Sequence, residues 1–320
     1  GLLRRGLAVE WADAALITNV AADHLGEYGI NTVAELTEAK FIVHRALDEH
    51  SPLILNADDA GVVNYEQGLR KQRPGTSWWF SLDAANPRLQ SAMEQGATVC
   101  FLRDGALWLV TGEERTPRRL AGVAEVSASH GGLLRHNLQN AMGAVLVAMA
   151  MGVSESALKQ GLQDFRGDEQ DNPGRGNWFA HAGIRIVVDF AHNAHGLRAL
   201  GDAVTALQPG RVILMTGQAG DRDDEAIREL TRAALCMHPD VLLINQLPGY
   251  ERGRPIDVPP AVIRAEALAN GMLPEQLEIM QDPLHGTRRA LELARAGDVL
   301  VLLAHIQRQE VLQLVHDFVR

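Results

Sequence analysis

The residues of this sequence best suited to chemistry are Asp189, which ends an apolar run at residues 184–189, and His192 and Asn193, which follow it. A helix is predicted shortly after them, at residues 196–207. The first backbone N–H groups of a helix form a natural site for an anion. A carboxylate, an imidazole and an amide beside such a site can hold and orient an anionic ligand. This segment therefore predicts a binding site at the end of a strand.

A second set of charged residues follows the next two apolar runs of the same half of the chain. The set consists of Asp221, Arg222, Arg252 and Arg254. Because ligands of parallel sheets sit beyond the carboxyl ends of the strands, these residues are expected at the same edge as Asp189. The alternative for the two later arginines is a solvated basic turn. Asp223 and Asp224 open the next predicted helix, so we interpret them first as caps that complement its dipole.

Two features of the first half of the chain can also serve a bound ligand. Asp23 and His24 come shortly after the apolar run at residues 14–18, and a neutral imidazole can ligate Mg²⁺ beside phosphate oxygens. A hydrogen-bonded or capping pair is the alternative. Lys40 lies on a predicted helix at residues 32–46, where a solvent-exposed lysine is the default interpretation.

Asn137 and Asn140 stand three residues apart on an otherwise apolar predicted helix at residues 136–151, so they share a face. An adenine edge or the nearby backbone can satisfy their amides. Arg175 follows Pro173-Gly174 at the exit of a polar segment, and its planar guanidinium suits a phosphate. An exposed loop arginine is the alternative there.

The order of the predicted elements indicates an α/β protein of two domains. Strands are predicted at residues 14–18, 52–55, 98–102, 107–110, 184–189, 211–216, 241–244 and 299–303. Helices are predicted at residues 136–151, 154–165, 196–207, 223–237, 259–270, 283–296 and 307–319. Residues 166–177 are rich in Gly, Asp, Asn and Pro and predict a linker. The strict alternation of strand and helix beyond it predicts a doubly wound, largely parallel sheet.

Composition restricts the class of protein and of partner. The 320 residues are 46% hydrophobic and 22% charged, and no apolar run is long enough to cross a bilayer. A net charge of −10 argues against nucleic acid as the partner. Cys100 and Cys236 form no metal-binding pair, and two buried thiols in the cytoplasm are expected. No signal-peptide pattern is present, and the abrupt start at Gly1 suggests a preceding segment.

Taken together, these motifs resemble the Mur ligase superfamily, which joins a carboxylate to an amine at the expense of ATP through an acyl phosphate. The motifs occur in the family's order over nearly the whole chain. They are Thr18-Asn19, Asp23-His24-Leu25, Lys40, Asn56-Ala57-Asp58-Asp59, His136-Asn137-Leu138-Gln139-Asn140, Pro173-Gly174-Arg175 and Asp189-Phe190-Ala191-His192-Asn193. Residues 1–7, 19–26, 220–225 and 252–254 are similar to cyanophycin synthetase within that superfamily.

The resemblance implies a Mur ligase central ATP-binding domain over residues 1–170 and a Rossmann-like, doubly wound carboxy-terminal domain over residues 171–320. It implies ATP and Mg²⁺ as cofactors, with His24 as a metal ligand. The catalytic residues that it implies are Lys40, Asp189 and His192. The implied nucleotide contacts are Asn137, Asn140, Arg175, Asp189 and Asn193, and the implied substrate contacts are Asp221, Arg222, Arg252 and Arg254. Lys40 matches a lysine that is carbamylated in several relatives.

The expected reaction joins an amino acid such as arginine to a side-chain carboxylate of an aspartate peptide or polymer. The sequence contains no G-x-x-x-x-G-K-[ST], so the phosphate-binding loop is expected in a segment before Gly1, and the isolated chain is expected to fold without turnover. Residues 304–308 differ from the family pattern, which leaves the amino acid open. A peptidoglycan-type or folylpolyglutamate-type ligase and a non-catalytic nucleotide-binding module are the alternatives. The number of subunits is left open.

Overall fold

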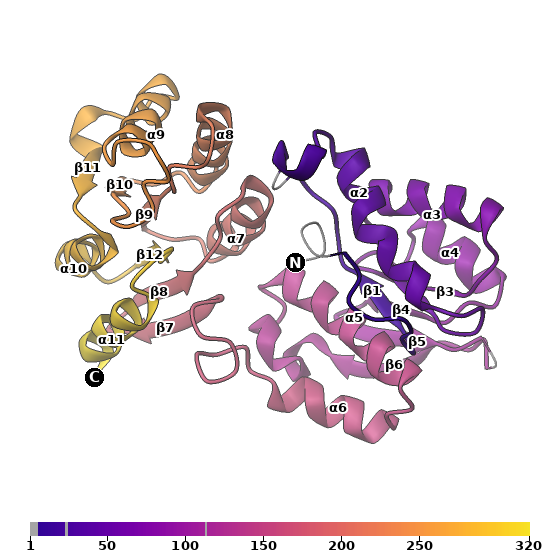
Figure 1. The fold of residues 1–320 in the computed structure, drawn as a ribbon. Helices are drawn as coiled ribbons and strands as arrows, with labels where there is room; N and C mark the ends of the chain where they lie inside the picture. Colours follow the sequence, from indigo (N-terminus) through magenta and orange to yellow (C-terminus); the bar gives the residue numbers. More distant parts are fainter. Residues whose placement is uncertain (1–5, 23–24, 113) are drawn as a thin grey trace. The chain divides into compact units, whose positions relative to one another are not determined.

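A computed structural model describes residues 6–22, 25–112 and 114–320 of the chain, which form two compact units (Figure 1). The units are Gly1–Arg166 and Gly167–Arg320. This division falls within the predicted linker, four residues before the domain boundary predicted after residue 170. Both units are α/β, as predicted. In the part of the chain that the structure describes, no helix is long and apolar enough to cross a membrane.

The first unit is built on a six-stranded sheet of order β1-β2-β3-β4-β5-β6. Its strands are β1 (Ala15–Ile17), β2 (Leu53–Asn56), β3 (Ser77–Ser81), β4 (Val99–Arg103), β5 (Ala106–Val110) and β6 (Arg118–Gly122). The first four strands are parallel, and β5 and β6 add an antiparallel edge. The carboxyl ends of β1 to β4 therefore share one edge of the sheet.

Helices cover both faces of this sheet (Figure 1). The described helices are α2 (Val33–Phe41), α3 (Ala60–Gln72), α4 (Pro87–Glu94), α5 (Arg135–Ala150) and α6 (Glu155–Asp164), with 3-10 turns η1 (Glu27–Gly29), η2 (Ile42–Ala46), η3 (Val123–Glu125) and η4 (Ser127–Ser129). Phe41, Trp79 and Leu89 belong to the core under α2, α3 and α4. Phe80 and Leu138 belong to the core under α5 and α6. Each such fully buried side chain stabilises the fold by about 2–3 kcal/mol.

The second unit is built on a six-stranded sheet of order β11-β10-β9-β12-β8-β7. Its strands are β7 (Asn177–His181), β8 (Ile184–Asp189), β9 (Arg211–Gly217), β10 (Val241–Asn245), β11 (Leu277–Met280) and β12 (Asp298–Leu303). All neighbours are parallel except β7 and β8, which form an antiparallel pair. The predicted doubly wound sheet is thus confirmed, with β7 as an added edge strand.

Helices also cover both faces of the second sheet, as a doubly wound sheet requires. They are α7 (Ala194–Ala206), α8 (Asp224–Leu235), α9 (Val258–Ala269), α10 (Pro283–Leu293) and α11 (Arg308–Val319), with the 3-10 turn η5 (Pro274–Gln276). One core contains Leu197, Ile227 and Ile263 from α7, α8 and α9. The other core contains Ala290 and Val311 from α10 and α11.

The expectation of two buried thiols is wrong for one cysteine. Cys100 is fully buried on β4, and burial raises the pKa of its thiol to about 12. Cys236 is exposed, because it follows the last residue of α8, and its Sγ donates to the backbone oxygen of Arg232 at 3.4 Å. Cys236 therefore sits at the solvated end of a helix rather than in the core.

Candidate functional site at the carboxyl edge of the second sheet

The turn after β8 arranges the residues that the sequence singled out first. Asp189 ends the strand, and its Oδ1 accepts a hydrogen bond from the backbone N–H of Ala191 at 2.6 Å. Asn193 caps α7, because its Oδ1 accepts from the backbone N–H of Gly196 at 2.8 Å. The carboxylate and the amide thus fix the turn that leads into the helix. His192 lies between them and is half-buried.

The ring of Phe190, in this turn, contacts two arginine and two histidine side chains. The guanidinium carbon of Arg175 lies 4.6 Å from the ring centroid, and that of Arg308 lies 4.9 Å from it. The rings of His192 and His305 lie 5.2 and 5.6 Å away. Cation–π stacking therefore holds two arginines beside the first turn of α7, where a helix terminus also favours negative charge. This grouping can receive a phosphate or carboxylate.

His305 lies two residues after the end of β12 and is neutral at physiological pH. Burial lowers its pKa to about 4, and the nearby His192 adds to this effect. Its Nε2 lies 2.9 Å from the backbone oxygen of Ala191, so Nε2 carries the proton and donates. Nδ1 is consequently a bare acceptor, and it is buried without a hydrogen-bond partner in the described part of the chain. The hydrogen bond from His305 to Ala191 therefore joins the turn after β12 to the turn after β8.

Asn177 holds the polar segment that precedes β7. The side chain is 1% exposed, its Oδ1 accepts from the backbone N–H of Gly174 at 2.5 Å, and its Nδ2 donates to the backbone oxygen of Asn172 at 3.1 Å and of Gly167 at 3.3 Å. Gly174 has a φ of +73°, which favours glycine. These bonds fix the segment that carries Arg175.

Asn177→Ala is expected to lower the stability of the second unit by about 2 kcal/mol, because the buried N–H of Gly174 and two backbone oxygens lose their partner. Limited proteolysis should then cleave residues 167–176 faster. Asn270→Ala is the matched control, since that exposed amide follows α9 and, among the described residues, bonds only to Glu266. Equal cleavage of the two variants would contradict the assigned role of Asn177.

The charged residues predicted to contact substrate lie together on two loops that pack against one another. Arg254 donates to the backbone oxygen of Arg222 at 2.8 Å and to Oδ1 of Asp224 at 2.6 Å. Arg252 lies 3.9 Å from Oδ2 of Asp221. Hydrogen bonds and ion pairs thus join the loops after β9 and β10 at the predicted edge of the sheet. Asp224 therefore binds Arg254, in addition to placing a negative charge at the start of α8.

The cap predicted for α8 is confirmed at Asp223, whose Oδ1 accepts from the backbone N–H of Ala226 at 2.8 Å. Gln218 is 6% exposed, and its Nε2 donates to the backbone oxygen of His192 at 3.5 Å. This bond joins the turn after β8 to the loop after β9. The two predicted sets of residues therefore meet at one edge of the sheet.

In the first unit, Asp58 is the centre of a polar network at the carboxyl ends of β2 and β3. Its carboxylate accepts from Ser81 Oγ at 2.5 Å, from Gln139 Nε2 at 2.9 Å and from Asn86 Nδ2 at 3.2 Å. Asn86 caps α4, and Gln139 lies on the first turns of α5. The network therefore positions the helix that carries Asn137.

The two asparagines of α5 differ in their surroundings. Asn137 is half-buried, and its Nδ2 donates to the backbone oxygen of Ala128 at 2.7 Å, which is the backbone alternative weighed from the sequence. Asn140 is exposed, as is Lys40 at the end of α2. No hydrogen bond or ion pair within the described residues joins Lys40 to either amide. His24 and Asp23 lie outside the described residues.

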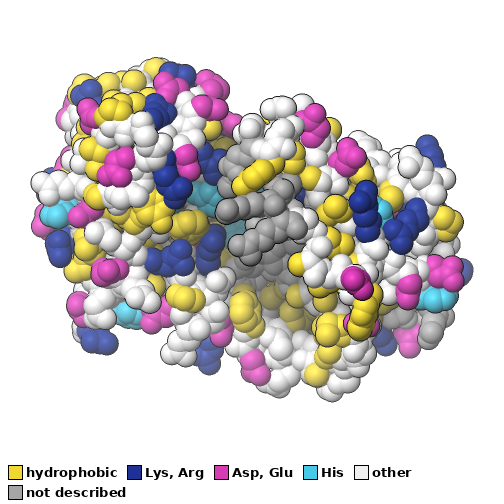
Figure 2. All heavy atoms as spheres, viewed as in Figure 1, with side chains coloured by type: hydrophobic (Ala, Val, Ile, Leu, Met, Phe, Trp, Pro, Cys, Tyr) yellow, Lys and Arg dark blue, Asp and Glu magenta, His cyan; other side chains and the backbone are white. Residues whose placement is uncertain are grey.

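Three residues of the second-unit site had no predicted role: Phe190, His305 and Arg308. The rule that ligands bind beyond the carboxyl ends of parallel strands could have identified His305 and Arg308, because residues 304–308 directly follow the predicted strand at 299–303. Figure 2 shows acidic and basic side chains interspersed over the face in view. The cationic character of the site is therefore local in a chain of net charge −10.

Known proteins resemble the chain over most of its length. The cyanophycin synthetase of Trichormus variabilis is 27% identical over 303 residues, which cover 95% of this chain and 33% of that protein. The UDP-N-acetylmuramate--L-alanine ligase of Roseiflexus sp. is 29% identical over 321 residues, which cover 96% of this chain and 63% of that protein. The chain thus spans about a third of the length of the cyanophycin synthetase.

Solved structures share the fold. E. coli FolC in complex with DHPP and ADP has a TM-score of 0.64 at 17% identity, covering 96% of this chain and 62% of that one. MurF from Thermotoga maritima in complex with ADP has a TM-score of 0.60 at 16% identity, covering 97% and 62%.

Two family models account for most of the sequence, one for each unit. The Mur ligase middle domain matches residues 8–148, and the Mur ligase glutamate ligase domain matches residues 174–305. The chain therefore belongs to the Mur ligase family, and its two units match that family's middle and carboxy-terminal domains.

Proposed function

We propose that this chain is part of an ATP-dependent amide ligase of the cyanophycin synthetase type. It joins an amino acid such as arginine to a side-chain carboxylate of an aspartate peptide or polymer, through an acyl phosphate. Family membership and the match to cyanophycin synthetase over 95% of the chain support the proposal. ATP supplies the phosphoryl group that activates the carboxylate.

The grouping at the carboxyl edge of the second sheet carries this proposal. Ligation through an acyl phosphate needs cations and oriented N–H donors around a phosphoryl group, together with a fixed position for the amine. Arg175 and Arg308 on the Phe190 ring, beside the first turn of α7, provide such cations and donors. Asp221 on the neighbouring loop is an acidic group that suits a cationic amino acid.

The described residues fit a phosphate better than a metal ion. Across residues 6–22, 25–112 and 114–320, no group of three or more His, Cys, Asp or Glu could hold a metal. His24, the residue expected to bind Mg²⁺, lies outside those ranges. We therefore assign phosphate contacts to Arg175 and Arg308.

Arg175→Gln is expected to weaken ATP binding about tenfold, because a charge-assisted hydrogen bond to phosphate is lost. Calorimetry with ATP and Mg²⁺ measures this loss, both on the chain and on a longer form that carries a phosphate-binding loop before Gly1. Arg185→Gln is the matched control, since Arg185 is exposed on β8 at the opposite end of the strand. Equal affinity of the two variants would contradict the assignment of Arg175.

Turnover separates this proposal from its alternatives. The longer form should release phosphate only when both an aspartate peptide and an amino acid such as arginine are present. Preference for a folate or for a nucleotide-sugar peptide would instead identify another Mur-type ligase. Nucleotide binding without ligation of any amino acid would identify a non-catalytic module. That the chain alone folds without turnover stays a prediction, which the same assay tests.

A further inference from the structure

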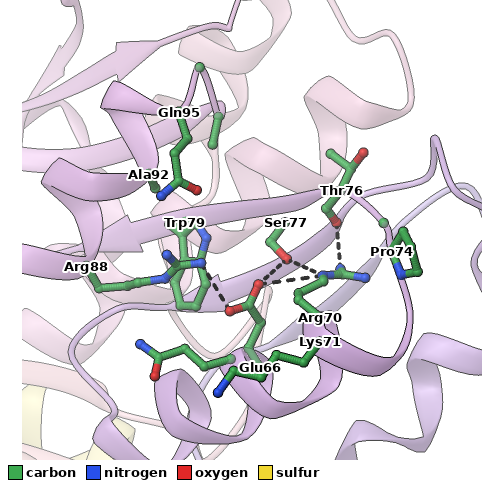
Figure 3. A pocket seen from close by; sticks show the side chains of 14 residues that line it. Glu66, Arg70, Lys71, Pro74, Thr76, Ser77, Trp79, Arg88, Ala92 and Gln95 are labelled. Atoms are coloured by element: carbon green, nitrogen blue, oxygen red, sulfur yellow. Dashed lines mark hydrogen bonds and ion pairs between the residues drawn. The ribbon is translucent and has the colours of Figure 1, made fainter.

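A pocket of about 650 Å³ lies in the first unit, between α3, α4 and the start of β3 (Figure 3). Its size falls within the range of sites for small molecules. Ser77, which lines it, begins β3, whereas the network around Asp58 lies at the other end of that strand. The pocket is therefore separate from the carboxyl edge where family motifs gather.

A buried carboxylate lies at the centre of the pocket. Glu66 is 2% exposed, and its Oε1 accepts from Ser77 Oγ at 2.7 Å. Arg88 donates to its Oε2 at 3.1 Å, and Arg70 Nε lies 3.6 Å from its Oε1. Figure 3 shows Glu66 between these two arginines. The carboxylate is thus already fully engaged and neutralises one of them.

The pocket carries more positive charge than Glu66 compensates. Its charged lining residues are Arg70, Lys71, Arg88 and Glu66, so three cations face one anion and the lining has a net charge of +2. The whole chain has a net charge of −10. Nη1 of Arg70, Nη1 of Arg88 and Nζ of Lys71 make no hydrogen bond to any residue that the structure describes. These donors remain for a ligand.

The two guanidinium groups are held in place without a ligand. Arg88 stacks on the fully buried Trp79, with its guanidinium carbon 4.3 Å from the ring centroid. Arg70 donates through Nε to Ser77 Oγ at 3.0 Å and through Nη2 to the backbone oxygen of Thr76 at 2.9 Å. A Cβ on Gly75 would lie 2.3 Å from Nη1 of Arg70, so any larger residue at position 75 would clash with this guanidinium. Binding therefore costs little side-chain entropy.

We propose that this pocket binds a small anion with at least two negative charges, through phosphate or carboxylate oxygens. A network that only joined α3 to α4 would need Glu66 and the two arginines, but neither the third cation nor an open volume of this size. The site is independent of the function proposed above, since no residue of that site lines it.

Titration of the chain with pyrophosphate and with citrate tests the proposal, because the two probes separate phosphate from carboxylate ligands. The indole N–H resonance of Trp79, assigned with Trp79→Phe, is expected to shift saturably with one of them, because Arg88 stacks on that ring. Calorimetry should give a single site. No saturable shift with either probe at about 10 mM would overturn the proposal.

Two exposed lining residues offer substitutions that leave the network around Glu66 intact. Lys71→Glu and Gln95→Glu are each expected to weaken binding about fivefold, because they add negative charge at the rim. Arg264→Glu, on the exposed side of α9, is the matched control and should change nothing. Unchanged affinity in both lining variants would overturn the proposal.

Discussion

Gly220→Ala is expected to lower the stability of the second unit by about 2–3 kcal/mol and to abolish amino-acid-dependent phosphate release by the longer form. A Cβ at this position would lie 1.9 Å from the backbone oxygen of Glu251 and 2.7 Å from its carbonyl carbon. Backbone cannot swing aside as a side chain can, so the loops after β9 and β10 must separate. The bond from the N–H of Gly220 to the oxygen of Tyr250, 2.9 Å long, would be lost.

Thermal unfolding measures the loss of stability, and amide exchange at residues 220 and 250–254 locates it. Gly161→Ala is the matched control, because a Cβ there meets no heavy atom within 4 Å and the residue lies inside α6. It should be neutral or stabilising, since alanine favours helix over glycine. If Gly220→Ala matched this control in stability and turnover, the contact between the loops would not position Asp221, Arg222, Arg252 and Arg254.

The carboxy-terminal sheet could be predicted well because its inner strands are continuous apolar runs. The run at residues 184–189 became β8 without a change of bounds, and those at 211–216 and 241–244 gained one residue each as β9 and β10. Strands buried on both faces leave such runs in the sequence. Helices alternate with them, which fixed the doubly wound topology.

Strands that lack such a run were missed. β7 begins with Asn177 in a segment that composition assigned to the linker, and its place depends on pairing with β8, where Asn177 lies opposite Val188. β3 reads Ser-Trp-Trp-Phe-Ser, a short aromatic stretch without alternation. β6 and β11 contain charged residues at the edges of their sheets. These segments form strands because they pair with neighbouring strands and are buried, and the local sequence predicts neither of these.

The candidate site shows the same division between local and tertiary information. Ligands of parallel sheets bind beyond the carboxyl ends of the strands, and this rule correctly predicted that the turn after β8 and the loops after β9 and β10 share one edge. It could not reveal that Phe190 holds Arg175 and Arg308, because those residues come from different parts of the chain. Nor could spacing show that Asn137 bonds to the oxygen of Ala128, since that partner belongs to a preceding 3-10 turn.

A partly buried ion pair joins the amino ends of two central strands of the second sheet. Arg211, the first residue of β9, donates through Nη2 to Oδ2 of Asp298 at 2.6 Å and through Nε to Oδ1 at 3.2 Å. Asp298, the first residue of β12, is 4% exposed and also accepts from the backbone N–H of Arg295 at 2.8 Å. Burial on its own raises the pKa of Asp298, but these hydrogen bonds outweigh burial and hold the pKa below its ordinary value.

Asp298→Asn is expected to lower the free energy of unfolding of the second unit by about 2–3 kcal/mol near pH 7, because Arg211 keeps its charge in a partly buried place without its partner. Denaturant unfolding of the full chain, followed by a probe in the second unit, measures the loss. Asp317→Asn removes the same charge from an exposed position 3.9 Å from Arg320 and should cost less than about 0.5 kcal/mol.

The pH dependence of this difference is a stricter test, because the pKa of Asp298 is lower in the folded protein than in the unfolded chain. Its contribution is then complete above about pH 4, the range of an unfolded aspartate, and is lost as the pH falls through the folded pKa. His305 destabilises both proteins equally between about pH 6.5 and its folded pKa of about 4, so only the difference between them reports Asp298. The two stabilities should converge below pH 4, and a difference that stayed constant there would show that the carboxylate stabilises the sheet by shape rather than by charge.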